Sequence, residues 1–137
     1  MGSHVLRASR WQLGVLMCGA LLVMITSSAR AVGDDIALTA ISHTALPGGQ
    51  LQINIRSSAP LPQPRVFRTS APDRIILDFF GVASALTSPV IDVGRGAVES
   101  VMVAQTEQRS RVVINLIAPV AYESVLDADG LTLVIHQ

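Results

Sequence analysis

DRIILDF at residues 73–79 and SRVVINL at residues 110–116 are the stretches that decide the fold. Each contains an arginine, three aliphatic residues, an Asp or Asn and a large apolar residue, and the second copy begins thirty-seven positions after the first. Short runs of β-branched and aromatic residues favour strands over helices. This internal repeat of residues 73–79 at residues 110–116, here called the echo, indicates a repeated structural unit. We therefore predict two similar half-units, each of which supplies one β-sheet.

The echo also predicts which side chains are buried, because successive side chains on a strand point to opposite faces. One set is apolar and is predicted to face the core: Ile75, Leu77, Phe79, Val112, Ile114 and Leu116. The other set contains the polar residues and is predicted to face outward: Arg74, Ile76, Asp78, Arg111, Val113 and Asn115. When two such sheets pack on their apolar faces, the outward set forms two exposed strips of the same design. These six outward residues are the candidate binding residues.

The other segments have the same short-strand character. Strict alternation at residues 51–56 (LQINIR) predicts a half-buried strand, which a Leu-Pro-Gly-Gly turn joins to a strand at residues 36–43. Pro60, Pro62 and Pro64 exclude regular sheet pairing, so the chain must cross over or follow an edge there. Further strands are predicted at residues 65–69, 74–80, 98–105, 111–118, 121–126 and 131–136, with one helical turn possible at 82–86. The predicted fold class is all-β, a small β-sandwich of two roughly symmetric, mainly antiparallel sheets.

Residues 1–31 have the pattern of a secretory signal peptide. Arg7 and Arg10 precede a wholly apolar run at residues 13–25, and Ala29-Arg30-Ala31 supplies the small residues for cleavage after Ala31. An uncleaved membrane anchor is the alternative, but a spanning helix needs about 18 or more apolar residues and this run has thirteen. We therefore predict export to the periplasm, one mature domain at residues 32–137, and no membrane span after cleavage.

Composition argues against several classes of function. The whole chain has a formal charge of zero, and cleavage leaves seven arginines against ten carboxylates, a charge of −3, which disfavours nucleic acid as a partner. The single cysteine, Cys18, lies in the predicted signal peptide. His43 and His136 are too few for a zinc amidase site, and no G-x-S-x-G motif occurs. Asp127-x-Asp129-Gly130 lacks the glutamate of a calcium loop and fits a tight turn. We predict no enzyme activity, no catalytic residues, no metal and no cofactor.

Four runs together resemble the AMIN domain, a family found at the front of type IV pilus secretins and of periplasmic N-acetylmuramoyl-L-alanine amidases. These runs are RIILDFFGV from residue 74, VGRGAVESVMVAQ from residue 93, SRVVINL from residue 110 and GLTLVI from residue 130. The resemblance extends over residues 36–136 and is closer to the secretin branch. It implies a non-catalytic sandwich that binds peptidoglycan and localises its host protein in the cell envelope. It also implies that the repeated motifs lie on the outer faces, on Arg74, Ile76, Asp78, Arg111, Val113 and Asn115.

Several functions remain open at this point. An arginine can pair with a carboxylate of the peptidoglycan stem peptide, and an Asp or Asn can accept hydrogen bonds from sugar hydroxyls. Alternatively, Arg74 and Asp78 form an ion pair that merely keeps the sheet soluble. The domain could instead be an adaptor that docks by a sheet edge onto a secretin, an amidase or another envelope protein. A third possibility is the targeting domain of an amidase whose catalytic half is absent from this chain.

Overall fold

The computed structural model describes residues 35–137, which form ten β-strands and no helix. The strands are β1 (Ile36–Leu46), β2 (Gln50–Ser57), β3 (Arg65–Thr69), β4 (Arg74–Phe80), β5 (Val82–Ser84), β6 (Val90–Arg95), β7 (Val98–Gln105), β8 (Arg109–Leu116), β9 (Ala121–Asp127) and β10 (Gly130–His136). Within this part of the chain there is thus no helix that is long and apolar enough to cross a membrane. The predicted signal peptide at residues 1–31 lies outside the described residues, and its cleavage stays a prediction.

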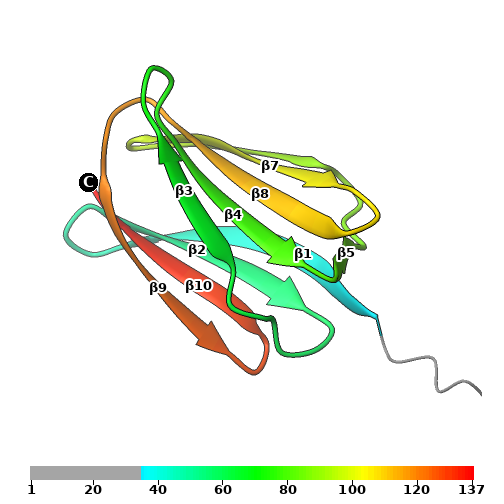
Figure 1. Cartoon of the computed structure of the whole chain (residues 1–137). Coiled ribbons are helices and arrows are strands. Elements are labelled where there is room, and N and C mark those ends of the chain that lie inside the picture. Colours follow the sequence, from blue (N-terminus) through cyan, green and yellow to red (C-terminus); the bar gives the residue numbers. More distant parts are fainter. Residues whose placement is uncertain (1–34) are drawn as a thin grey trace, which may run out of the picture. The chain divides into compact units, whose positions relative to one another are not determined.

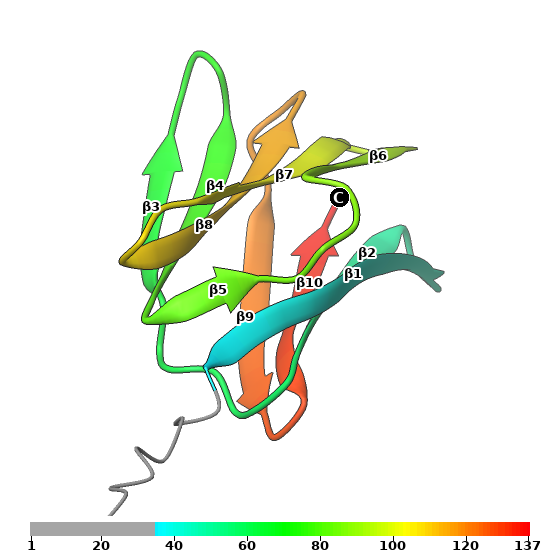
Figure 2. The same cartoon turned by 90° about the vertical axis from the view of Figure 1, so that its right-hand side faces the viewer.

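The strands form two five-stranded sheets that lie one above the other (Figures 1 and 2). Sheet A has the order β5-β1-β2-β10-β9, and sheet B has the order β3-β4-β8-β7-β6. All neighbouring strands are antiparallel except β1 and β5, which run parallel. The Pro-rich segment at residues 58–64 carries the chain from β2 in sheet A to β3 in sheet B. The predicted all-β sandwich is therefore confirmed.

One apolar core fills the space between the sheets. The six residues predicted from the echo to face inward are all buried, and the most exposed of them, Leu116, keeps only 7% of its surface in contact with solvent. Leu51, Ile53 and Ile55 of β2 and Leu131, Leu133 and Ile135 of β10 face them from sheet A. Burial of each such side chain contributes about 1.5–3 kcal/mol. Because residues 35–137 contain no cysteine, this packing replaces the disulfides that stabilise many small exported domains.

The prediction that each echo segment supplies its own sheet is wrong. The two segments are β4 and β8, which are antiparallel neighbours in the middle of sheet B. Their pairing places Asp78 opposite Arg111 and Arg74 opposite Asn115, so polar side chains meet polar side chains on one face. The same register places Ile75 opposite Ile114 on the other face. The two predicted outer strips are therefore one continuous surface.

Two strands were not predicted from the sequence. β5 occupies the segment for which one helical turn was considered, and it pairs in parallel with β1 at the edge of sheet A. β6 pairs with β7 at the edge of sheet B, and its pairing is irregular between Asp92 and Arg95. Short or interrupted edge strands show weak alternation of apolar and polar residues in the sequence, because much of their surface contacts solvent and fewer of their side chains have to be apolar.

Gly130 begins β10 at a position where a side chain does not fit. Its backbone φ is +146°, and an added Cβ would lie 1.8 Å from the carbonyl oxygen of Ile55 in β2. We expect Gly130→Ala to lower the free energy of unfolding by about 2–4 kcal/mol, because β2 and β10 would have to separate. Chemical denaturation of residues 32–137, which contain the whole core, measures this loss.

Gly48→Ala is the matched control for this prediction. Gly48 also has a positive φ, +81°, but an added Cβ would have no heavy atom within 4 Å. Its substitution should cost only about 1 kcal/mol, from backbone strain alone. Equal losses in the two variants would contradict a steric requirement at Gly130.

Candidate functional site

The outer face of sheet B, here called the sheet B face, carries side chains arranged in three rows across the strands. The apolar row crosses all five strands and consists of Phe67, Ile76, Val113, Met102 and Val90, each opposite the next in the strand register. Phe67, Met102 and Val90 are 45%, 44% and 42% exposed. With neighbouring strands about 4.8 Å apart, the row is about 19 Å long. Exposed apolar patches of this extent on small domains commonly mark interaction surfaces.

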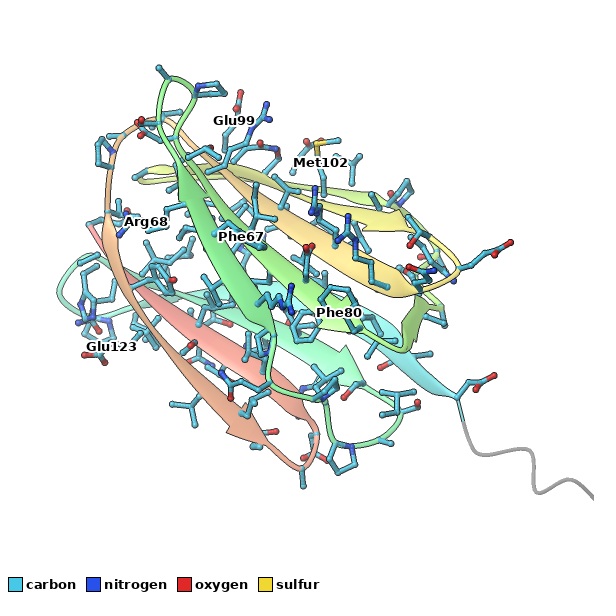
Figure 3. All side chains as sticks on the ribbon, in the orientation of Figure 1. Phe67, Arg68, Phe80, Glu99, Met102 and Glu123 are labelled. Carbon is cyan, nitrogen blue, oxygen red and sulfur yellow. The ribbon has the colours of Figure 1, made fainter. Side chains whose placement is uncertain are left out.

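Polar rows flank the apolar row on both sides. The charged row consists of Arg65, Asp78, Arg111 and Ala104, and Phe80 and Arg109 lie opposite each other in the next row beyond it. The polar row on the other side consists of Thr69, Arg74, Asn115, Ser100 and Asp92. The amide nitrogen of Asn115 donates a hydrogen bond to the Ser100 hydroxyl over 3.0 Å. Figure 3 labels Phe67, Phe80 and Met102, which belong to strands β3, β4 and β7 of this sheet.

All six residues predicted to face outward lie on the sheet B face, within two adjacent strands. Arg74 is exposed, and Ile76, Arg111, Val113 and Asn115 are half-buried. Asp78 differs, because only 1% of its surface is exposed. Neighbouring arginines cover it. The suggested ion pair between Arg74 and Asp78 is not formed.

Asp78 is instead bound by the arginines of β8. Its two carboxylate oxygens accept hydrogen bonds from Nε and Nη2 of Arg111, over 2.7 and 2.8 Å. Arg109 Nη1 lies 3.3 Å from Asp78 Oδ2. The hydrogen bonds from Arg111, and the charges of Arg111, Arg109 and Arg65, hold the pKa of Asp78 below its ordinary value of 3.8, although burial opposes this shift. The same hydrogen bonds raise the pKa of Arg111.

Sequence reasoning missed the other residues of the sheet B face, and five of these are large or charged side chains that matter for binding. These are Arg65, Phe67, Phe80, Met102 and Arg109. Period-two alternation would have placed Phe80 beside Asp78, because the two are separated by one residue on β4. The others required knowledge of which strands are neighbours.

Arg68 of β3 does not belong to the sheet B face. It lies on the inward side of β3, where its guanidinium donates a hydrogen bond to the carbonyl oxygen of Val120. It also lies 5.5 Å from the centre of the Tyr122 ring of β9. Arg68 thus links the edge strands of the two sheets.

The outer face of sheet A has a different chemistry. Its central residues are uncharged and bind one another: the Gln52 amide donates to Asn54 Oδ1 over 2.8 Å, and Thr132 donates to the same oxygen over 3.3 Å. The centre of the outer face of sheet A thus carries amides and hydroxyls, whereas the sheet B face carries four arginines and an apolar row. The sheet B face is the stronger candidate, because Arg65 and Arg74 form no ion pair with any of residues 35–137 and Phe67 and Phe80 remain 45% and 43% exposed.

Groups that could hold a metal are not evident on either face. Among residues 35–137, no three or more His, Cys, Asp or Glu side chains gather in one place. The Asp127 carboxylate accepts a hydrogen bond from the backbone N–H of Asp129 over 2.8 Å. This hydrogen bond is typical of a tight turn, and the Asp127–Gly130 segment forms such a turn between β9 and β10.

Comparison with known proteins relates the chain to a family and to several curated proteins. The model of the AMIN domain matches residues 40–135. The fimbrial assembly protein PilQ of Pseudomonas aeruginosa is 29% identical over 124 residues, which cover 90% of this chain and 16% of that protein. The type IV pilus biogenesis and competence proteins PilQ of Neisseria gonorrhoeae and Neisseria meningitidis are 26% identical over 100 residues, or 73% of this chain. The chain thus spans about one-sixth or less of the length of these relatives. No solved structure gives a significant match.

The buried ion pair of Asp78 leads to a prediction about stability. We expect Asp78→Asn to lower the free energy of unfolding at pH 7 by about 2–3 kcal/mol, because Arg111 loses a charged partner. The folded-state pKa of Asp78 is below 3.8, so the pair adds stability above that pH and loses it as the pH falls through the folded pKa. The difference in free energy of unfolding between wild type and Asp78→Asn should therefore reach its maximum at about pH 5 and above and become smaller in more acidic solution. Denaturant titrations across this pH range measure it.

Asp129→Asn provides the control, because Asp129 forms an exposed ion pair with Arg56 over 3.6 Å. Its loss should cost less than about 1 kcal/mol. A difference between wild type and Asp78→Asn that stays constant down to the acid limit of folding would contradict the assignment to ionised Asp78.

Proposed function

The chain belongs to the AMIN domain family, and on this basis we propose that residues 32–137 form a non-catalytic domain that binds peptidoglycan in the cell envelope. The host is proposed to be a secretin-type protein of a type IV pilus. The relatives reported above are pilus proteins, which favours this host over an amidase. The predicted signal peptide agrees with a periplasmic location.

The observation that carries the proposal is the chemistry of the sheet B face. Four of the seven arginines in residues 35–137 lie on it: Arg65, Arg74, Arg109 and Arg111. Peptidoglycan offers carboxylates on its stem peptides and hydroxyl and amide groups on its sugars. Guanidinium groups bind carboxylates in a planar, two-bonded geometry, and the amide of Asn115 can bind hydroxyls. The half-buried Ile76 and Val113 provide a flat surface between these polar groups.

In this proposal Asp78 orients the arginines and does not accept hydrogen bonds from the sugars. Its carboxylate is buried and is already bound by Arg111. It therefore positions Arg111 and Arg109 for a ligand rather than touching the ligand itself. Each contact on so shallow a face is weak, and several copies of the domain in one assembly would strengthen retention through avidity.

Sedimentation with purified sacculi tests the proposed function. We expect residues 32–137 to pellet with sacculi, and we expect Arg74→Glu to weaken this binding roughly tenfold, which corresponds to the loss of one charge-assisted contact. Arg74 is exposed and forms no ion pair with any residue in the range 35–137. Its substitution should therefore leave the fold intact, which circular dichroism checks.

Arg56→Glu is the matched control, because Arg56 is an exposed arginine on the outer face of sheet A. It should pellet like the wild type. Equal weakening of sacculus binding in both variants would contradict a specific contact on the sheet B face. A wild-type domain that stays in the supernatant would contradict peptidoglycan binding.

A protein-protein adaptor is the second candidate, and the apolar row favours it. Exposed Phe67 and Met102 are suited to a protein partner, and every residue of the edge strand β3 is exposed. Sacculi treated with protease separate the two functions. A peptidoglycan-binding domain should pellet equally with treated and untreated sacculi, whereas an adaptor should pellet only with untreated sacculi that retain envelope proteins.

A further inference from the structure

Three strand ends bring two arginines and an aromatic ring together at one corner of the sheet B face. Arg65 begins β3, Arg109 begins β8 and Phe80 ends β4. The register places Arg109 opposite Phe80, and Arg65 lies opposite Asp78, which is one step along the same face of β4. The guanidinium carbons of Arg65 and Arg109 lie 5.3 and 5.7 Å from the centre of the Phe80 ring. The ring remains 43% exposed.

The charges at this corner do not balance. Three guanidinium groups, those of Arg65, Arg109 and Arg111, surround the single carboxylate of Asp78, which leaves a formal charge of +2. Arg111 makes two hydrogen bonds to that carboxylate, whereas Arg109 makes one longer contact of 3.3 Å. Arg65 makes no ion pair with any residue in the described part of the chain.

Structural stability does not require this excess of positive charge. A buried carboxylate is satisfied by the two hydrogen bonds from Arg111. The guanidinium groups of Arg65 and Arg109 lie over the same ring and repel each other, and an exposed contact with an aromatic ring offsets this repulsion only weakly. Glu107 borders a hollow beside Arg109 but forms no ion pair with any of residues 35–137. Within residues 35–137 the corner therefore has no second carboxylate that forms an ion pair with Arg65 or Arg109.

We propose that Arg65 and Arg109, held over the ring of Phe80, form a carboxylate-binding subsite that takes a free carboxylate of the peptidoglycan stem peptide. This inference rests on the proposed function and specifies which part of peptidoglycan is bound at this corner. Arg65 and the free edge of Arg109 bind the carboxylate oxygens. The exposed Phe80 ring contacts the small aliphatic side chains of the peptide, and Asp78 keeps Arg109 in place from below.

Two soluble stem peptides of the same sequence test the subsite. One peptide carries free carboxylates, and in the other every carboxylate is amidated. We expect the free peptide to shift the backbone amide resonances of Arg65, Phe80 and Arg109 in the isotopically labelled domain. The amidated peptide should bind at least fivefold more weakly, because a neutral amide offers a guanidinium only one weak acceptor.

Substitutions separate ligand binding from stability. Arg65→Gln should reduce affinity for the free peptide at least fivefold while leaving the thermal midpoint within about 2 °C of wild type, because Arg65 is exposed, contacts only the exposed face of Phe80 and forms no ion pair within residues 35–137. Arg65→Lys keeps the charge but loses the planar fork, so it should restore part of the affinity. Arg56→Gln on sheet A should bind like wild type. Unchanged affinity of Arg65→Gln overturns the subsite.

Sedimentation of the same preparation with sacculi distinguishes the two possible failures. Pelleting together with equal binding of the free and amidated peptides overturns the carboxylate subsite and leaves peptidoglycan binding in place. Absence of pelleting overturns the proposed function, and the subsite with it. Pelleting together with selective binding of the free peptide supports both.

Discussion

The antiparallel pairing of β4 with β8 is the constraint on which both surfaces of sheet B depend. Ile75 faces Ile114 and Leu77 faces Val112 on the inner side, and the same register sets Asp78 opposite Arg111 on the outer side. A shift of one residue in either strand would exchange its two faces. It would bring charged groups into the core, where an unpaired charge is very unfavourable. The core and the outer surface therefore specify the same register.

The ion pair between Asp78 and Arg111 is best understood in this context. Removing a carboxylate from water is costly, and the hydrogen bonds from Arg111 offset that cost without a large surplus. A shift of one residue would place Asp78 opposite Ser110 or Val112 and leave its carboxylate without a guanidinium partner opposite it. We interpret the pair as one of the interactions that oppose a one-residue shift, and it also orients Arg109 beside it.

The sandwich has two sheets of equal strand number but unequal outer chemistry. Sheet A presents amides and hydroxyls that are largely bound to one another, such as Gln52, Asn54 and Thr132. Sheet B presents four arginines together with an exposed apolar row. Binding energy comes from groups whose partners are not already supplied within the fold, and this is the physical reason for proposing the ligand site on sheet B. The near symmetry of the fold does not extend to the chemistry of its two outer faces.

The amino-acid sequence by itself determined the fold class, the phase of the two echo strands and the family. The phase of a strand is a local property, because alternation with period two decides which side chains share a face, whatever the neighbouring strand is. The fold class and the family follow from the number and order of such strands and motifs along the chain. Only the tertiary structure decided that β4 and β8 are neighbours, that Asp78 is buried, and that Arg65, Phe80 and Arg109 meet at one corner. Strand order depends on contacts between segments far apart in the chain, and no period within a single strand encodes it.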